Sequence, residues 1–203
     1  MANSNINNAL HRSAYHHGDL RAELVRAGIQ LLETTGAAEF SLREVARTVG
    51  VSASAPYRHF PEKGDLLEAI AAEGYRRLTA LVGTPGAVVG EAAREMEAFA
   101  LGHPAWWEVM IGRGADSGGE LEEARSGLLA ELVGVVDRSG RRRDSEAAIR
   151  GAVAVWAGVV GLVRLRTGGA LMLLDAGLVP GAAEFAEAAV SVRRSRSVPS
   201  PQR

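Results

Sequence analysis

The residues best suited to chemistry lie between Ser41 and Lys63, in the segment SLREVARTVGVSASAPYRHFPEK. Hydroxyl, guanidinium and imidazole groups follow one another here at short spacing up to the run from Tyr57 to His59, and the amine of Lys63 comes last. Side chains of these types donate hydrogen bonds to phosphate oxygens, and together they are typical of groups that contact a nucleic-acid backbone. Whether these side chains can contact a nucleic acid together depends on the secondary-structure elements that position them.

The spacing of apolar and capping residues predicts two short helices joined by a tight turn. Ser41 and Glu44 have the S-x-x-E form of a capping box, in which the serine accepts from the first turn and the glutamate reaches back. Gly50 is expected to end this helix, because glycine adopts the left-handed conformation at little cost. Ser52 can cap the next helix. The layout is that of a helix-turn-helix, whose second helix enters the DNA major groove. One apolar face of the first helix carries Leu42, Val45, Ala46 and Val49.

The second helix is predicted over residues 52–59, with Pro56 inside it. Proline has no N–H group and fits only the first turn of a helix. Either Ser52 caps the helix and one backbone hydrogen bond is lost, or Ser54 caps it and Pro56 takes the second position. We expect an early, tightened turn here. Phe60 follows as the apolar anchor of the segment.

Composition limits the class of protein. The chain has 203 residues, is 47% hydrophobic and carries a formal net charge of −1, which suits one or two small domains with a real core. The absence of cysteine excludes disulfides, thiolate catalysis and zinc fingers. Residues 1–80 hold nine basic and nine acidic side chains. Nucleic-acid binding must therefore depend on a locally basic face rather than on a basic domain.

No segment favours a membrane or a metal site. The N-terminal residues lack an apolar core of the kind found in signal peptides. The most apolar run, residues 151–163, is shorter than the ~20 residues that a membrane helix needs. His11, His16 and His17 have no cysteine or patterned carboxylate near them, so we expect no metal and no cofactor. We expect a cytoplasmic protein that does not enter a membrane.

The hydrophobic period is helical throughout, so the expected fold is all-α. We expect a disordered arm over residues 1–14, a three-helix helix-turn-helix domain over 15–82, a helical domain over 83–194 and a disordered tail over 195–203. Asp19 is the expected cap of the first helix, and Gly36 its expected end. The C-terminal helices are predicted at 88–101, 105–111, 120–139, 146–167 and 180–192. The helix at 146–167 is apolar nearly all round, so a second subunit is its expected cover.

Five sub-patterns occur in order over the first 80 residues: the capped short helix, Gly-Val-Ser, Tyr-x-His-Phe, x-x-Lys and Leu-Leu. This series resembles the TetR family of bacterial one-component transcription regulators. The family usually has a larger apolar residue at the position of Pro56. The resemblance implies that Ala53, Ser54 and Tyr57 approach the bases. The guanidinium groups of Arg43 and Arg58 would add positive charge to this surface. The resemblance also implies DNA-backbone contacts from Ser41, Ser52, Tyr57, His59 and Lys63.

The C-terminal half resembles the regulatory domain of a TetR subgroup through His-Pro-Ala-Trp-Trp-x-x-Met at 103–110 and Trp-Ala-Gly at 156–158, where the subgroup has Trp-His-Gly. The resemblance implies a ligand cavity around Met96, Phe99, Trp106, Trp107 and Met110. It also implies a dimer interface around Trp156, Val160, Val163, Phe185 and Ala189. Aromatic and methionine side chains at helical spacing also fit plain core packing.

The first functional hypothesis is a ligand-responsive repressor that binds a palindromic operator in double-stranded DNA as a homodimer, controlled by a small apolar effector. A second is a ligand-binding or partner module whose head no longer reads specific DNA. A third is an all-helical enzyme, for which His103 and Glu108 are five residues apart across a proline and no cysteine or Gly-Ser-Gly nucleophile elbow is present. We expect a regulator and no enzyme.

Overall fold

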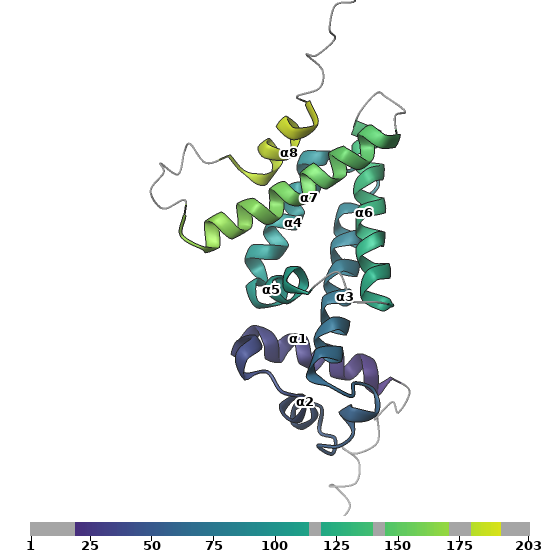
Figure 1. Cartoon of the computed structure of the whole chain (residues 1–203), viewed down its shortest axis with the longest axis vertical. Coiled ribbons are helices and arrows are strands. Elements are labelled where there is room, and N and C mark those ends of the chain that lie inside the picture. Colours follow the sequence, from purple (N-terminus) through teal and green to yellow (C-terminus); the bar gives the residue numbers. More distant parts are fainter. Residues whose placement is uncertain (1–18, 114–118, 140–144, 171–179, 192–203) are drawn as a thin grey trace, which may run out of the picture. The chain divides into compact units, whose positions relative to one another are not determined.

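The computed structural model describes residues 19–113, 119–139, 145–170 and 180–191, and all regular structure in them is helical. The all-α prediction is confirmed (Figure 1). The chain forms two compact units, Met1–Leu66 and Leu67–Arg203, divided near the start of α3. The predicted arm, tail and N-terminal histidines lie outside the described residues. The elements are α1 (Leu20–Glu39), α2 (Leu42–Val49), the 3₁₀ helix η1 (Pro56–Arg58), α3 (Lys63–Val82), α4 (Val89–Gly102), α5 (Pro104–Gly112), α6 (Glu120–Ser139), α7 (Ser145–Thr167) and α8 (Ala182–Ser191).

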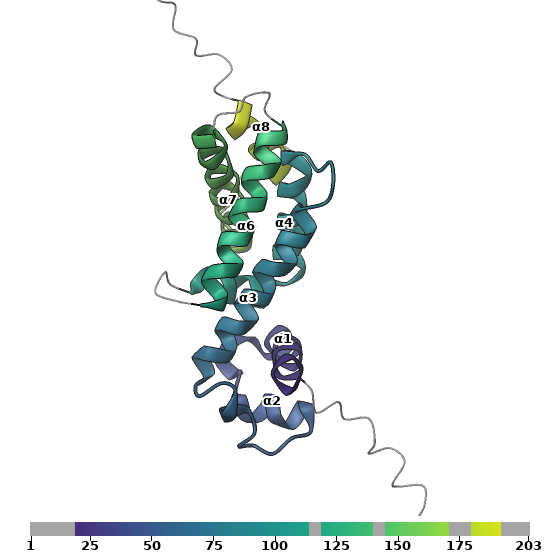
Figure 2. The ribbon, with the colours of Figure 1, turned by 90° about the vertical axis from the view of Figure 1, so that its right-hand side faces the viewer.

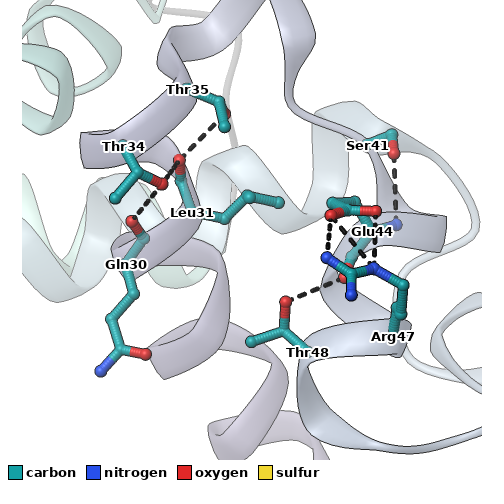
Figure 3. Close-up of polar contacts among 8 residues, drawn as sticks. All are labelled: Gln30, Leu31, Thr34, Thr35, Ser41, Glu44, Arg47 and Thr48. Carbon is teal, nitrogen blue, oxygen red and sulfur yellow. Dashed lines mark hydrogen bonds and ion pairs between the residues drawn. The ribbon is translucent and has the colours of Figure 1, made fainter.

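The first unit is built by local signals that the sequence displays. The Asp19 carboxylate accepts a hydrogen bond from the Ala22 N–H at 3.0 Å and so starts α1. Near its end, Gly36 takes a left-handed φ of 74°, which breaks the helix as predicted. Just before this break the Thr34 and Thr35 hydroxyls donate to backbone carbonyls one turn back (Figure 3). The buried apolar core of the unit contains Leu24, Leu32, Phe40, Leu42, Val45, Phe60 and Leu66.

The second unit is a helical bundle in which α4, α6, α7 and α8 pack on one another (Figure 2). The short helix α5 is fixed to the middle of α3 by two buried polar contacts. The Trp106 indole N–H donates to the Ile70 carbonyl at 2.8 Å, and the Tyr75 hydroxyl donates to the Met110 carbonyl at 3.3 Å. Both contacts satisfy groups that would be costly to bury alone. They set the position of α5 against α3.

Gly74 makes this close approach of α5 possible. A Cβ at Gly74 would lie 2.3 Å from the Met110 sulfur and 2.9 Å from the Trp106 indole nitrogen. Real Cβ atoms do not tolerate such distances, and the indole is held by its hydrogen bond to Ile70. Gly74 is therefore needed for its lack of a side chain.

Glu97 joins three helices of the bundle, α4, α7 and α8. Its side chain is buried on α4, and its Oε2 accepts from the Ala182 N–H at 3.2 Å, at the first turn of α8. Arg166 of α7 places Nη1 2.6 Å from Glu97 Oε1, a close charge contact with a poor angle for a hydrogen bond. A carboxylate at a helix N-terminus is favoured by the helix dipole. Glu97 therefore stabilises the first turn of α8. The helix begins at Ala182, two residues later than predicted.

The helix α7 is longer than the apolar run that the sequence analysis considered. By length and composition alone, Ser145–Thr167 is long and apolar enough to span a membrane: it has a mean hydropathy of 1.6, and 33% of its most apolar window is buried in the protein. A core helix of a globular protein meets the same criterion. This one packs against α4, α6 and α8 and ends in the ion-paired residues Arg164 and Arg166.

We expect Gly74→Ala to lower the free energy of unfolding by about 1–3 kcal/mol, because the new methyl group overpacks the contact with Met110 and Trp106. Gly127→Ala is the matched control: it lies inside α6 with nothing within 4 Å of the added Cβ. That change should be neutral or stabilise by up to about 1 kcal/mol. Urea unfolding of both variants measures this. Equal stability of the two variants would contradict the close-packing account of Gly74.

Candidate nucleic-acid interface and ligand pocket

The helix α2 begins at Ser41, whose hydroxyl oxygen accepts from the Glu44 N–H at 3.2 Å (Figure 3). The other half of the predicted capping box is not formed. Instead, the Glu44 carboxylate accepts from Arg47 Nε at 3.1 Å and pairs with its Nη2. Two charge-assisted bonds from the guanidinium outcompete one neutral backbone N–H. The hydrogen bond from Arg47 lowers the pKa of Glu44.

The turn after α2 closes as predicted. Gly50 has φ 81°, and its N–H donates to the Ala46 carbonyl at 2.9 Å. The Val51 N–H donates to the same carbonyl at 3.0 Å. A left-handed glycine that satisfies the last carbonyls of a helix is the usual way to reverse the chain sharply. The residues that follow are therefore presented directly beside α2.

The predicted α-helix over residues 52–59 is wrong in form: the segment is a turn followed by the 3₁₀ helix η1. The Ala55 N–H donates to the Ser52 carbonyl at 3.0 Å, and Pro56 takes the first position of η1. The His59 N–H then donates to the Pro56 carbonyl at 2.9 Å. Because Pro56 has no N–H, the longer helix would lose a bond in its interior, and a tight turn avoids that loss. The expected tightening is confirmed.

Neither serine caps η1. The Ser52 and Ser54 hydroxyl oxygens lie 3.3 Å apart and hydrogen bond to each other, and Ala55 is the residue before η1. Both hydroxyls are exposed and so remain able to bond to an outside group. A hydroxyl has one donor and two acceptor positions, and only part of that capacity is used here.

The segment of residues 52–60 exposes polar side chains, and two of its residues are buried and fix its backbone. Pro56 and Phe60 are buried, whereas Tyr57, between them, is 45% exposed. The buried side chains of Pro56 and Phe60 hold the backbone in place, and the ring of Tyr57 is left exposed to solvent. The other exposed members of the predicted set are Arg43, Ser52, Ala53, Ser54, Arg58, His59 and Lys63; Ser41 is half-buried by its capping role.

Lys63, the first residue of α3, has a contact within the protein. Its ammonium donates to the Ala37 carbonyl at 2.8 Å and lies 5.8 Å from the centre of the Phe40 ring. The bond satisfies a carbonyl in the last turn of α1, which ends at Glu39. An ammonium has three donors, so Lys63 can hold α1 and still bind a phosphate. The start of α3 is further capped by Asp65, which accepts from the Glu62 N–H at 2.7 Å.

The five residues predicted to line a ligand cavity are all buried in the second unit: Met96, Phe99, Trp106, Trp107 and Met110. Phe99 and Trp106 pack with ring centres 5.3 Å apart, and Trp107 packs on Trp156 at 5.6 Å. The structure places these side chains in the core. A role for them in ligand binding stays a prediction.

A pocket of about 430 Å³ lies elsewhere in this unit, between α3, α6 and α7. Of the residues predicted for the functional sites, Trp156 alone lines this pocket. Tyr75 lines it as well, and the ring centres of Tyr75 and Trp156 are 5.9 Å apart. Sequence reasoning missed the pocket, because its walls come from segments far apart in the chain. The lining residues are Tyr75, Arg113, Glu122, Arg125, Leu128, Leu129, Leu132, Val153 and Trp156.

Arg125 supports this pocket from α6. Its guanidinium donates to the Arg113 carbonyl at 2.7 Å and lies 5.7 Å from the centre of the Tyr75 ring. Burial raises the pKa of Tyr75, and a hydrogen bond with Arg125 opposes that rise. The tyrosine therefore stays protonated at neutral pH and keeps its bond to Met110.

The predicted dimer residues differ in how much surface they offer. Val163 is 1% exposed and packs in the core of its own chain. Trp156, Val160 and Ala189 are half-buried, and Phe185 is exposed. Phe185 also packs tightly on α7, because a Cβ at Gly158 would lie 2.3 Å from its ring.

A capped helix, a left-handed glycine turn and a short second helix that presents polar groups define a helix-turn-helix DNA-binding unit. The chain matches the family model for bacterial regulatory proteins of the tetR family over residues 24–70. It matches the model for a tetracyclin repressor-like C-terminal domain over residues 89–192. The chain belongs to the TetR family of bacterial DNA-binding transcription regulators, as its motifs predicted.

Three known proteins are similar to the chain in sequence or in fold. The nucleoid occlusion factor SlmA of Vibrio campbellii is 43% identical over 51 residues, which are 25% of this chain and 26% of that protein. The match thus spans about a quarter of that relative. A Rhodococcus sp. RHA1 protein of unknown function is 29% identical, with a TM-score of 0.67 over 89% of this chain and 96% of that one. A TetR variant from Acinetobacter baumannii AYE, in complex with minocycline, shares the fold at 19% identity and a TM-score of 0.64, over 88% and 98% of the chains.

We expect Tyr57→Ala to weaken duplex binding by about tenfold or more, because an exposed ring and hydroxyl are removed from a fixed backbone. Leu81→Ala is the control, since Leu81 on α3 is similarly exposed at 38% but lies in the other compact unit. Gel shifts with both variants, with circular dichroism as a check of folding, measure the effect. Unchanged binding by folded Tyr57→Ala protein would contradict the assignment of Tyr57.

Proposed function

We propose that the protein is a cytoplasmic, ligand-responsive repressor that binds a palindromic operator as a homodimer. The observation that supports this most is the exposed polar segment from Ser52 to His59, whose backbone is held by the buried residues Pro56 and Phe60. A structure that fixes its polar groups before binding loses less entropy when DNA arrives. A dimer seated on a promoter excludes other proteins from that DNA, which favours repression.

The exposed groups divide into two kinds of contact. Ser41, Ser52, Tyr57, His59 and Lys63 would bind phosphates and fix the position of the unit on the duplex. Ser54 and Arg58 are the groups best able to donate to base edges. Ala53 has only a methyl group, which suits contact with the methyl group of thymine.

Because η1 is short, few side chains reach the bases, and DNA shape should carry much of the specificity. The number of basic groups at this surface is also small, with Arg43, Arg58 and Lys63 as the exposed ones of the predicted set. Phosphate contacts make affinity depend on salt in proportion to their number. Binding should therefore fall with salt, with a moderate slope.

A homodimer would place two such units on neighbouring major grooves, about 34–36 Å apart. The helices α7 and α8 offer the apolar surface for that contact. On α7 the side bearing Ala157, Gly161 and Leu165 is exposed, and Phe185 of α8 is also exposed. Small residues allow two helices to approach closely. Val163 is left out of this interface because it has no exposed surface.

Control by an effector would act through α3, which runs without interruption from Lys63 to Val82. Its first residue is one of the proposed phosphate ligands, and Tyr75 lines the pocket. Arg76, next to Tyr75, also forms an ion pair with Glu120 of α6. A ligand that binds better to one position of α3 would shift the population toward or away from the DNA-binding form, by no more than its difference in affinity.

The second candidate is a ligand-binding module whose N-terminal unit no longer reads sequence. The shortness of η1 favours it, since residues 53–55 form a turn instead of a helix and two of them are alanines. A module of this kind would bind duplexes of every sequence alike, or none. The two candidates therefore differ in sequence preference and not in fold.

We expect Leu165→Glu to separate the dimer into monomers and to weaken binding to a two-site duplex, because a charge would enter the apolar contact. Ile149→Glu is the matched control. Both residues lie on α7 and are 48% exposed, and their spacing puts them on nearly opposite sides of the helix. Sedimentation velocity and duplex titration measure both effects. Loss of the dimer in both variants, or in neither, would contradict the proposed face.

A further inference from the structure

The pocket between α3, α6 and α7 changes in character along α6. Glu122 and Arg125 line it near the start of this helix, and Leu128, Leu129 and Leu132 line it further along. The distance from Glu122 to Leu132 along the helix axis is about 15 Å, because each residue of an α-helix adds ~1.5 Å. The pocket therefore has a charged end and an apolar end.

The first part of α7 lies beside the apolar end of the pocket (Figure 1). A Cβ at Gly151 of α7 would lie 2.8 Å from Cγ1 of Val136, which follows Leu132 on α6 by one turn. The start of α7 therefore packs against the last part of α6, and not against the part that carries Glu122 and Arg125.

An exposed apolar strip, formed by Ile149, Val153 and Trp156, continues from the pocket along this part of α7. The three residues are spaced at i, i+4 and i+7, so they lie on one face of the helix. Val153 and Trp156 line the pocket, whereas Ile149 lies one turn beyond Val153 and does not. Val153 is 49% exposed, Ile149 48% and Leu129, across on α6, 39%. The apolar lining is thus continuous with apolar surface outside the pocket.

The strip is too small for a protein partner. Stable protein interfaces bury ~800 Å² on each side, and a few half-exposed side chains supply only a small part of that. Charged residues also bound the strip, because Glu146 and Arg150 are exposed on α7 and form an ion pair with each other. A narrow apolar surface that continues a pocket of about 430 Å³ suits the chain of a small, elongated molecule.

The charged end favours a polar group without net charge. Its lining contains both signs, with Glu122 on one side of the balance and Arg113 and Arg125 on the other. Arg125 is already engaged within the protein, since its guanidinium donates to the Arg113 carbonyl at 2.7 Å and lies 5.7 Å from the centre of the Tyr75 ring. A charged ligand of either sign would meet a like charge here. A hydroxyl avoids this and can both donate and accept.

We propose that the pocket binds a linear amphiphile with an uncharged polar head, such as a primary alcohol, and an unbranched alkyl chain. The head lies at the end lined by Glu122 and Arg125, and the chain runs past Val153 toward Ile149. Each CH₂ group placed on this surface leaves water, which stabilises the complex. This rests on the proposed function, in which the pocket is the effector site, and it gives the apolar effector its shape and its head group.

The shape is tested by titration of the full chain, followed by tryptophan fluorescence, with 1-octanol and its branched isomer 2-propyl-1-pentanol. The two have the same composition and the same hydroxyl group, but only 1-octanol is extended. It should bind about fivefold or more tighter than the isomer. Affinity should also rise about twofold or more for each CH₂ group from 1-hexanol to 1-octanol. Equal or tighter binding of the isomer, no rise with length, or no binding of 1-octanol would overturn the proposal.

The head group is tested with octanoate and octylammonium at neutral pH. Both should bind more weakly than 1-octanol, because each brings a charge to an end that already holds a like charge. Tighter binding of either ion would show that the head group is wrong.

Val153→Ser should weaken 1-octanol binding about threefold or more, because a hydroxyl replaces apolar surface in the middle of the strip. Val88→Ser is the matched control: Val88, the residue before α4, is 46% exposed and does not line the pocket. It should leave 1-octanol binding unchanged. Equal binding by the two variants would contradict the path of the chain. Loss of the dimer in Val153→Ser, together with no alcohol binding to the unchanged protein, would assign the strip to a second copy instead.

Duplex binding by the same samples is read separately. Failure of the alcohol site leaves the DNA-binding proposal standing, and failure of duplex binding leaves the alcohol site standing. If 1-octanol binds without changing the affinity for the duplex, the site is right and its role as the effector site is wrong.

Discussion

The absence of an N–H group on Pro56 is the constraint on which the exposed polar surface of residues 52–59 depends. It prevents a regular α-helix from running through residues 52–59. The segment instead forms a turn followed by the 3₁₀ helix η1. Pro56 and Phe60 are then buried on one side, which turns Tyr57, Arg58 and His59 outward. The same proline that shortens the second helix therefore also fixes the groups that it presents.

The second unit depends on a different kind of constraint, which is close packing around α5. Gly74 lets the Trp106 indole reach the Ile70 carbonyl, and the Tyr75 hydroxyl reaches the Met110 carbonyl from the next position. Because these bonds hold Tyr75, one wall of the pocket is set by the core and not by flexible surface residues. A ligand in the pocket would thus act on a rigid part of α3.

Much of the first unit could be predicted because its signals are local. Asp19, Ser41 and Gly50 each act on residues three or four positions away, and each does what its type and spacing predict. The capping box was only half right, because Arg47 competes for Glu44 at a spacing that also appears in the sequence. The form of η1 did not follow from the sequence, because Pro56 fits the first turn of a helix capped by either Ser52 or Ser54.

The pocket could not be predicted, for the opposite reason. Its walls combine Tyr75, Arg113, Arg125 and Trp156, which are brought together only by the packing of α3, α6 and α7. The family resemblance implied a cavity around five aromatic and methionine side chains, and their helical spacing also fitted core packing; all five are buried. Helical periodicity shows which residues face inward. It does not show where the buried faces of neighbouring helices leave a cavity between them.

The central claim is sequence-specific binding of double-stranded DNA by a dimer with a short second helix. Selection of random duplexes by the purified full chain, first at low salt and then at higher salt, tests it most directly. The account predicts enrichment of a palindromic sequence, with half-sites about one helical turn apart, that persists at the higher salt. Binding that shows no sequence preference and disappears with salt, or no binding at all, would contradict it.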